Sequence, residues 1–107
     1  MVTLNSKMIK VLSKSPLGSI TNIDRKKIPV LIEFTSRKTD DAWYIVEGEP
    51  DSGVMFGLCV VNGVAKLEYV DIKKISSFGN IEYKIKPRKT LFDVKRKTNY
   101  NYPDELV

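Results

Sequence analysis

A cluster of carboxylates in the middle of the chain is the first feature that could do chemistry. Five acids fall within twelve positions: Asp40, Asp41, Glu47, Glu49 and Asp51. Their spacing matches the alternating ligands of a calcium loop only in part, because Pro50 interrupts the run and Leu58 stands where a bidentate glutamate is needed. Three interpretations stay open: a solvated hairpin end, an acidic surface that occupies the basic nucleic-acid groove of a partner protein, and weak metal binding.

Basic residues gather toward the two ends of the sequence. Residues 1–27 carry six Lys and Arg against one acid, residues 84–97 carry seven against one, and residues 28–83 carry five against nine. Such ends could contact phosphates, although lysine stripes on helices commonly serve only solubility. The candidates for phosphate contact are Lys7, Lys10, Lys14, Arg88, Lys89, Lys95, Arg96 and Lys97, with Arg25, Lys26, Lys27, Lys84 and Lys86 beside them.

Side chains suited to catalysis are scarce. The chain has no histidine and one cysteine, which removes the usual base near neutral pH and makes a zinc site unexpected. Cys59 lies in an apolar run and is expected to be a buried structural thiol. We therefore expect no catalytic residue, no metal site and no cofactor, and predict that the protein is not an enzyme.

The strands that must position these residues can be read from turn signals and hydrophobic period. Three strand-like runs between residues 43 and 70 predict an antiparallel meander, with a wide turn at 49–53. Asn62-Gly63 is a strong hairpin signal, because a two-residue type I′ turn needs positive φ at both positions. Further strands are expected at 28–35 and 81–85. The expected core consists of Ile32, Phe34, Trp43, Ile45, Phe56, Leu58, Leu67, Tyr69, Ile81, Tyr83 and Ile85.

Helices are expected near both ends of the chain. The first runs from Thr3 or Asn5 to about Ser15, with short helical turns at 72–76 and after Thr90. We predict one α+β domain over residues 1–97, with an antiparallel meander sheet of four to six strands, an N-terminal helix and short C-terminal helices. Residues 98–107 are expected to form a flexible tail.

The same sequence predicts a soluble protein of the cytoplasm. No apolar run approaches the length that crosses a bilayer, so no membrane partner is expected. The N-terminus does not have the order of basic, apolar and cleavage regions that marks a signal peptide. A single cysteine suits a reducing compartment.

The chain from Ile28 to Val94 resembles an uncharacterised family. The residues that carry the resemblance are Trp43-Tyr44, Phe56-Gly57-Leu58, Leu67-Glu68-Tyr69-Val70 with Asp71-Ile72-Lys73-Lys74-Ile75, Ile81-Glu82, and Lys86-Pro87 with Leu91. Their order is similar to that of the family catalogued as domain of unknown function 2958, which occurs in bacterial plasmids, integrative elements and phages. The resemblance implies a mobile-element setting and brings no catalytic residues.

These observations lead to two main hypotheses. In the first, the chain is a non-enzymatic phage or mobile-element protein that inhibits a host defence effector, most concretely a CRISPR nuclease, by stoichiometric occlusion through its five acids. In the second, it is a nucleic-acid-binding accessory protein of plasmid or phage replication or transfer, held by its basic ends. A third interpretation, an assembly subunit whose exposed strand edge pairs with a partner, stays open. The oligomeric state is not predicted.

Overall fold

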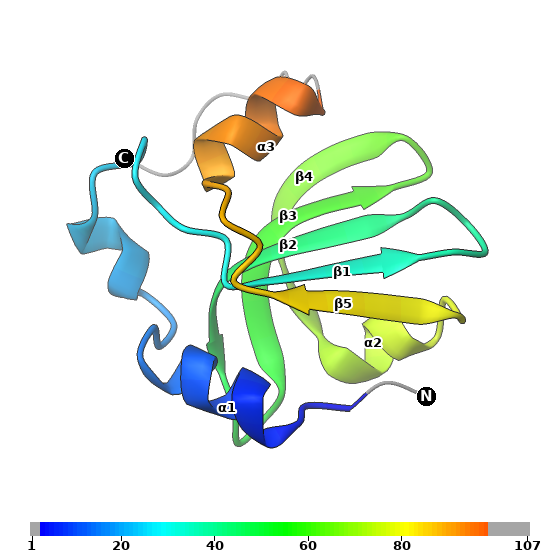
Figure 1. Cartoon of the computed structure of the whole chain (residues 1–107), viewed down its shortest axis with the longest axis horizontal. Coiled ribbons are helices and arrows are strands. Elements are labelled where there is room, and N and C mark those ends of the chain that lie inside the picture. Colours follow the sequence, from blue (N-terminus) through cyan, green and yellow to red (C-terminus); the bar gives the residue numbers. More distant parts are fainter. Residues whose placement is uncertain (1–2, 99–107) are drawn as a thin grey trace.

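The computed structural model describes residues 3–98, which form one antiparallel sheet with helices on both of its faces (Figure 1). The elements in chain order are α1 (Ser6–Ser13), the 3-10 helix η1 (Ser19–Asn22), β1 (Ile32–Ser36), β2 (Ala42–Glu49), β3 (Val54–Val61), β4 (Val64–Asp71), α2 (Ile72–Ser76), β5 (Ile81–Ile85) and α3 (Leu91–Lys97). The predicted α+β fold with four to six antiparallel strands is confirmed. The tail predicted for residues 98–107 lies, apart from Thr98, outside the described residues.

The strands follow the order β4-β3-β2-β1-β5. The first four form a meander, and β5 returns to pair with β1 at the far edge of the sheet. Figure 1 shows the sheet strongly curved, with α1 and α2 on one side and α3 on the other. None of the helices within residues 3–98 is long and apolar enough to cross a membrane.

Two apolar clusters, one on each face of the sheet, hold these layers together. Trp43 and Tyr44 show the alternation, because Trp43 packs toward α1 and α2 and Tyr44 packs toward the α3 side. The α1 cluster contains Met8, Val11, Leu12, Leu31, Ile32, Phe34, Trp43, Ile45, Met55, Cys59 and Ile75. The α3 cluster contains Ile20, Ile28, Val30, Val46, Leu58, Ala65, Leu67, Leu91 and Val94.

Two tyrosines predicted in the core are exposed instead. Tyr69 on β4 is 63% exposed and Tyr83 on β5 is 45% exposed. Both strands lie at edges of the sheet. At an edge, a side chain that alternates in phase with core residues is not necessarily covered by a helix. The period of the sequence predicted β4 and β5 as strands, but it does not say which strands become edges.

The first strand begins later than predicted, at Ile32 rather than Ile28. Residues 28–30 contact the segment after β5, because the Val30 N–H donates to the Lys89 carbonyl at 2.9 Å and the Leu91 N–H donates to the Ile28 carbonyl at 2.8 Å. Pro29 and Thr90 form an isolated bridge in the same stretch. A proline at a strand start is tolerated because it has no N–H to donate.

The hairpin at Asn62-Gly63 is confirmed. Asn62 has φ 54° and Gly63 has φ 78°, as a type I′ turn requires. The Asn62 N–H also donates to Asp41 Oδ1 at 2.9 Å, which ties this turn to the start of β2.

Replacing Gly63 by valine should therefore destabilise the fold. A Cβ at this position would meet no heavy atom within 4 Å, so the penalty comes from the left-handed backbone, which costs an L-residue about 1–2 kcal/mol. Gly63→Asn is the matched control, since asparagine tolerates this conformation. Thermal unfolding of both variants tests the turn, and equal melting temperatures for Gly63→Val and the wild type would contradict it.

Candidate nucleic-acid interface

A single groove is lined by Lys7 and Lys10 of α1, by Lys14, which caps the end of that helix, and by Lys86, which follows β5. Helix α1 buries Met8, Val11 and Leu12 against the sheet, which leaves its lysines on an adjoining stripe. The residues that line the groove are Lys7, Lys10, Val11, Lys14, Ser15, Leu31, Ile85 and Lys86, and its volume is about 320 Å³. The lining thus combines three aliphatic side chains with four lysines.

Helix α1 is held at both of its ends, and this fixes the lysine stripe relative to the sheet. Asn5 caps the helix, because its Oδ1 accepts from the Met8 N–H at 2.9 Å. The Asn5 amide also donates to the Tyr83 hydroxyl on β5 at 3.0 Å. At the other end, the Ser15 carbonyl accepts from the Gly48 N–H of β2 at 3.0 Å. The cap residue thus links α1 to β5, the strand that directly precedes Lys86.

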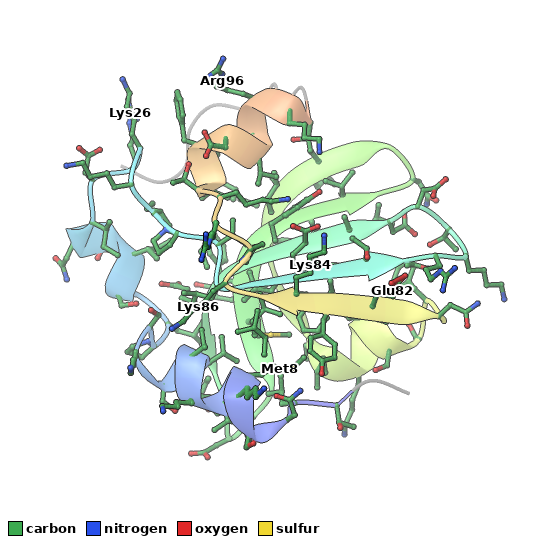
Figure 2. The ribbon with its side chains drawn as sticks, viewed as in Figure 1. Met8, Lys26, Glu82, Lys84, Lys86 and Arg96 are labelled. Atoms are coloured by element: carbon green, nitrogen blue, oxygen red, sulfur yellow. The ribbon has the colours of Figure 1, made fainter. Side chains whose placement is uncertain are left out.

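Lys86 reaches the groove through an unusual turn. Lys86 and Arg88, on either side of Pro87, have φ 52° and 62°, a left-handed conformation that non-glycine residues rarely adopt. The Lys86 N–H donates to the Leu31 carbonyl at 2.7 Å, which holds the turn against β1. Strain of this kind gathers at functional sites. Figure 2 shows Lys86 on the α1 side of the strand end, with Lys84 and Glu82 farther along β5.

The charge of the groove is uniformly positive. None of its lining residues is a carboxylate, and none of its four lysines forms an ion pair with a carboxylate within residues 3–98. The sequence placed Lys7, Lys10 and Lys14 correctly on one stripe but left Lys86 as a mere neighbour of the predicted set. The only local signal for Lys86 is its position between a strand and a proline.

Lys89, another predicted phosphate contact, is engaged elsewhere. Its Nζ lies 2.7 Å from Oε1 of the buried Glu33 and 5.9 Å from the centre of the Tyr44 ring. Glu33 Oε1 accepts no aligned hydrogen bond, so the ammonium group is its main compensation. Burial, and then the Glu33 charge, raise the pKa of Tyr44, while Lys89 opposes the shift. Lys89 therefore stabilises the α3 face of the sheet and does not line the groove.

Lys95, Arg96 and Lys97, in the last turn of α3, belong to a second basic surface, whereas Arg88 lies in the turn between β5 and α3. Arg96 lies 5.8 Å and Lys26 lies 5.7 Å from the centre of the Phe92 ring, so two cations share one aromatic side chain. Figure 2 shows Lys26 and Arg96 projecting outward at this end of the molecule. Lys95 and Lys97 belong to the same helix, which covers the face of the sheet opposite α1. The predicted basic set is thus divided between two faces.

Helix α3 begins with a complete capping box. Thr90 Oγ1 accepts from the Asp93 N–H at 3.2 Å, and Asp93 Oδ2 accepts from the Thr90 N–H at 3.1 Å. The hydrogen bond from the Thr90 backbone is the largest cause that lowers the pKa of Asp93, followed by the one with the Thr90 side chain. This cap orients the basic last turn of α3.

Two of the five predicted acids are buried and serve the fold. Asp41 accepts from the Asn62 N–H, as described above. Glu47 is 3% exposed, and its Oε2 accepts from the Ile20 N–H at 3.2 Å, which holds η1 against the sheet. An irregularity in the β2–β3 register between Ile45 and Glu47 accompanies this inward position. Neither carboxylate is available to a partner protein.

The other three predicted acids lie at opposite ends of β2. Asp40 precedes the strand, Glu49 is its last residue and pairs with Val54, and Asp51 follows in the turn. Eight residues of strand extend about 26 Å. The structure therefore does not gather the five acids into one surface. Within residues 3–98, no cluster of His, Cys, Asp and Glu could hold a metal ion.

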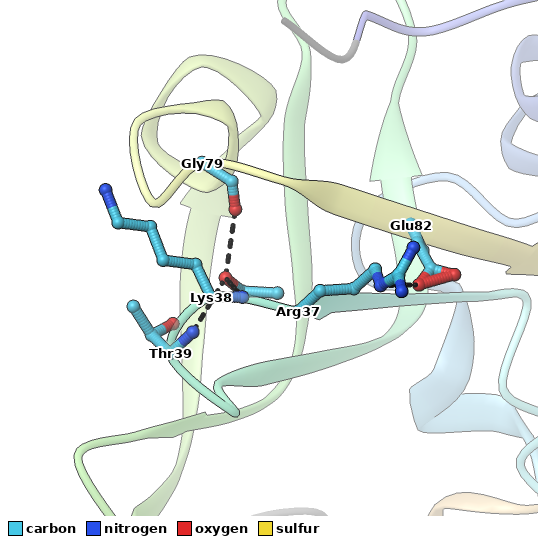
Figure 3. Close-up of polar contacts among 6 residues, drawn as sticks. Arg37, Lys38, Thr39, Gly79 and Glu82 are labelled. Atoms are coloured by element: carbon cyan, nitrogen blue, oxygen red, sulfur yellow. Dashed lines mark hydrogen bonds and ion pairs between the residues drawn. The ribbon is translucent and has the colours of Figure 1, made fainter.

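The Asp40 N–H donates to the Ser36 carbonyl at 3.1 Å. Figure 3 shows the mixed polar region around this turn, between β1 and the start of β5. The Ser36 hydroxyl donates to the Gly79 carbonyl at 2.9 Å and accepts from the Lys38 and Thr39 N–H groups at 3.3 and 3.2 Å. Arg37 and Glu82 form an ion pair of 3.2 Å beside it. Basic and acidic groups alternate here, so this end does not form an acidic patch.

Cys59 is the buried thiol that the sequence predicts. It packs in the α1 cluster. Burial, with a smaller contribution from Glu68, raises the pKa of its thiol to about 12. A thiol with so high a pKa is almost wholly protonated at neutral pH, which makes it a poor nucleophile.

Glu47→Lys should unfold or strongly destabilise the protein, whereas Glu49→Lys should not. The first change places an ammonium group in a buried site and leaves the Ile20 N–H without its acceptor. We expect it to lower the free energy of unfolding by about 3 kcal/mol or more. The second changes an exposed residue by the same charge and should stay within about 0.5 kcal/mol of the wild type. Urea denaturation compares them, and equal stabilities would refute the structural role of Glu47.

Thr90→Ala should open the capping box of α3. Loss of the hydroxyl acceptor should lower the free energy of unfolding by about 1 kcal/mol. The pKa of Asp93 should rise only in part toward its ordinary value, because the backbone N–H at position 90 is kept and the side-chain contribution is lost. NMR titration can measure this rise.

The pH dependence of this effect has a definite sign. Since the folded-state pKa of Asp93 lies below the unfolded one, its contribution is present above the unfolded pKa and is lost as pH falls through the folded pKa. The difference in the free energy of unfolding between the wild type and Thr90→Ala should therefore become smaller at acid pH. Thr98→Ala, at the other end of α3, is the control. An Asp93 pKa unchanged by Thr90→Ala would argue against the box.

No family model, no curated protein and no solved structure matches this chain. The similarity to domain of unknown function 2958 accordingly stays a prediction. The fold and the charge distribution of the described residues are the basis on which a function can be proposed.

Proposed function

We propose that the chain is a non-enzymatic nucleic-acid-binding protein that holds a phosphate backbone in the groove between α1 and the end of β5. The observation that carries this proposal is that Lys7, Lys10, Lys14 and Lys86 line one groove, and that its lining contains no carboxylate. Lysine contacts to phosphates supply affinity that does not depend on base sequence. An accessory role in plasmid or phage replication or transfer fits the mobile-element setting that the resemblance implies.

The dimensions of the groove favour a duplex. From Lys7 to Lys14 the helix rises about 10 Å, so the lysines form a short row that could follow a phosphate backbone of regular shape. None of the lining residues is aromatic, so the base stacking that single-strand binders use is missing from the groove. We expect contacts to the backbone of double-stranded DNA or RNA.

Inhibition of a host defence effector ranks second among the proposed functions. Its mechanism requires a contiguous acidic surface, but Asp41 and Glu47 are buried and Asp40 is separated from Glu49 and Asp51 by the length of β2. The mobile-element resemblance remains its support.

Changing Lys7, Lys10 and Lys14 together to glutamate should weaken binding to the same extent for every base sequence. The slope of log affinity against log salt concentration for duplex DNA should become shallower by about 0.9 for each phosphate contact removed. Fluorescence titrations of labelled double-stranded DNA, single-stranded DNA and RNA at low and near-physiological salt provide the measurement.

Two single variants that change the net charge equally distinguish an effect of the groove from an effect of the overall charge of the protein. Lys86→Glu should weaken binding, whereas Lys38→Glu, in the β1–β2 turn, should have little effect. Equal losses in both would show that the groove is not the site. Absence of binding at low salt would reject the proposal and leave the inhibitor hypothesis ahead, and tighter binding to single strands would reject the duplex preference.

A further inference from the structure

Strand β4 is an open edge of the sheet. It stands last in the strand order, and no strand within residues 3–98 pairs with its outer side. It is eight residues long, with Val64 46% and Tyr69 63% exposed. A long edge with exposed apolar side chains is a template for pairing with another chain, and natural proteins usually shorten or cover such edges.

The pairing with β3 determines which backbone groups of β4 face outward. Val61 lies opposite Val64 beside the two-residue turn, where such hairpins close with a hydrogen-bonded pair. Hydrogen-bonded and non-hydrogen-bonded pairs alternate along an antiparallel ladder. Lys66 and Glu68 therefore turn their N–H and C=O groups toward β3, and Ala65, Leu67 and Tyr69 turn theirs toward the open edge.

We propose that β4 pairs with β4 of a second copy of this chain, antiparallel and centred on Leu67, so that the two sheets become continuous across a two-fold axis. Leu67 then faces the same residue of the second copy, and Ala65 faces the second copy's Tyr69, a small side chain beside a large one. Lys66 faces the second copy's Glu68, and by symmetry Glu68 faces the second copy's Lys66.

The charges are the reason to choose a second copy as the occupant. Neither Lys66 nor Glu68 forms an ion pair with another residue in the range 3–98, and both are exposed. In the proposed register they form two cross-strand pairs of opposite charge. These are non-hydrogen-bonded pairs, in which the facing side chains lie closer together.

Neighbouring registers are disfavoured by the same residues. Pairing centred on Lys66 would place this lysine opposite the same lysine of the second copy. Pairing centred on Glu68 would likewise place two glutamates opposite each other. Like charges directly opposite each other destabilise a ladder. Pairing centred on Ala65 would place Lys66 opposite the second copy's Val64, and pairing centred on Tyr69 would place Glu68 opposite the second copy's Val70. Among these registers, only the one centred on Leu67 pairs opposite charges.

Charge-swap variants test the dimer, without nucleic acid and independently of the proposed groove. Sedimentation equilibrium of the full chain, up to millimolar concentration, should show a monomer–dimer equilibrium. Lys66→Glu and Glu68→Lys should each weaken dimerisation about tenfold or more, because both symmetric pairs become like-charged. The double variant K66E/E68K should restore it, and a mixture of the two single variants should form heterodimers.

Lys73→Glu, which changes an exposed lysine of α2, is the matched control and should leave dimerisation unchanged. Circular dichroism of every variant verifies that the fold is intact. A wild-type chain that stays monomeric throughout would overturn the proposal. So would a dimer that neither single variant weakens, or a mixture of single variants that associates no better than each alone.

Discussion

The antiparallel pairing of β1 with β5 is the constraint on which the rest of the structure depends. Five residue pairs join these strands, from Ile32 with Ile85 to Ser36 with Ile81. The hydrogen bonds of residues 28–31 with residues 86–91 continue the contact beyond the strands. This pairing brings the basic region near the C-terminus beside the basic region near the N-terminus. Without it, Lys86 would lie far from α1 and the sheet would end at β1.

The curved sheet also separates positive charge into two surfaces. One consists of α1 with Lys86, and the other consists of α3 with Lys26. The apolar clusters between them are close-packed, so a single short phosphate backbone cannot touch both without passing around an edge of the sheet. The aromatic ring shared by Lys26 and Arg96 makes the α3 surface chemically distinct from the aliphatic groove.

Local features of the fold could be predicted from the sequence, because neighbouring residues determine them. The Asn62-Gly63 turn and the caps Asn5, Asp71 and Thr90 are of this kind. The groove was only half predictable. Lys7, Lys10 and Lys14 share a stripe by helical period, but their meeting with Lys86 depends on a pairing between strands that are far apart in the sequence.

Burial of the acids was not predictable, for a related reason. Glu47 points inward at an irregularity in the strand register, and its side chain accepts a hydrogen bond from a backbone N–H of η1. The sequence did not predict η1. The exposure of Tyr83 likewise depends on β5 becoming an edge. Alternation along a strand predicts to which face of the sheet a side chain points. Which residues surround it on that face depends on the topology.

The left-handed backbone at Lys86 implies a conflict between stability and charge. Glycine adopts such a φ at no steric cost, so a chain selected for stability alone would be expected to carry glycine there. Lys86 is exposed, and it lines a groove with three other lysines. The backbone conformation opposes the folded state, and an anion in the groove would be attracted by four charges of the same sign.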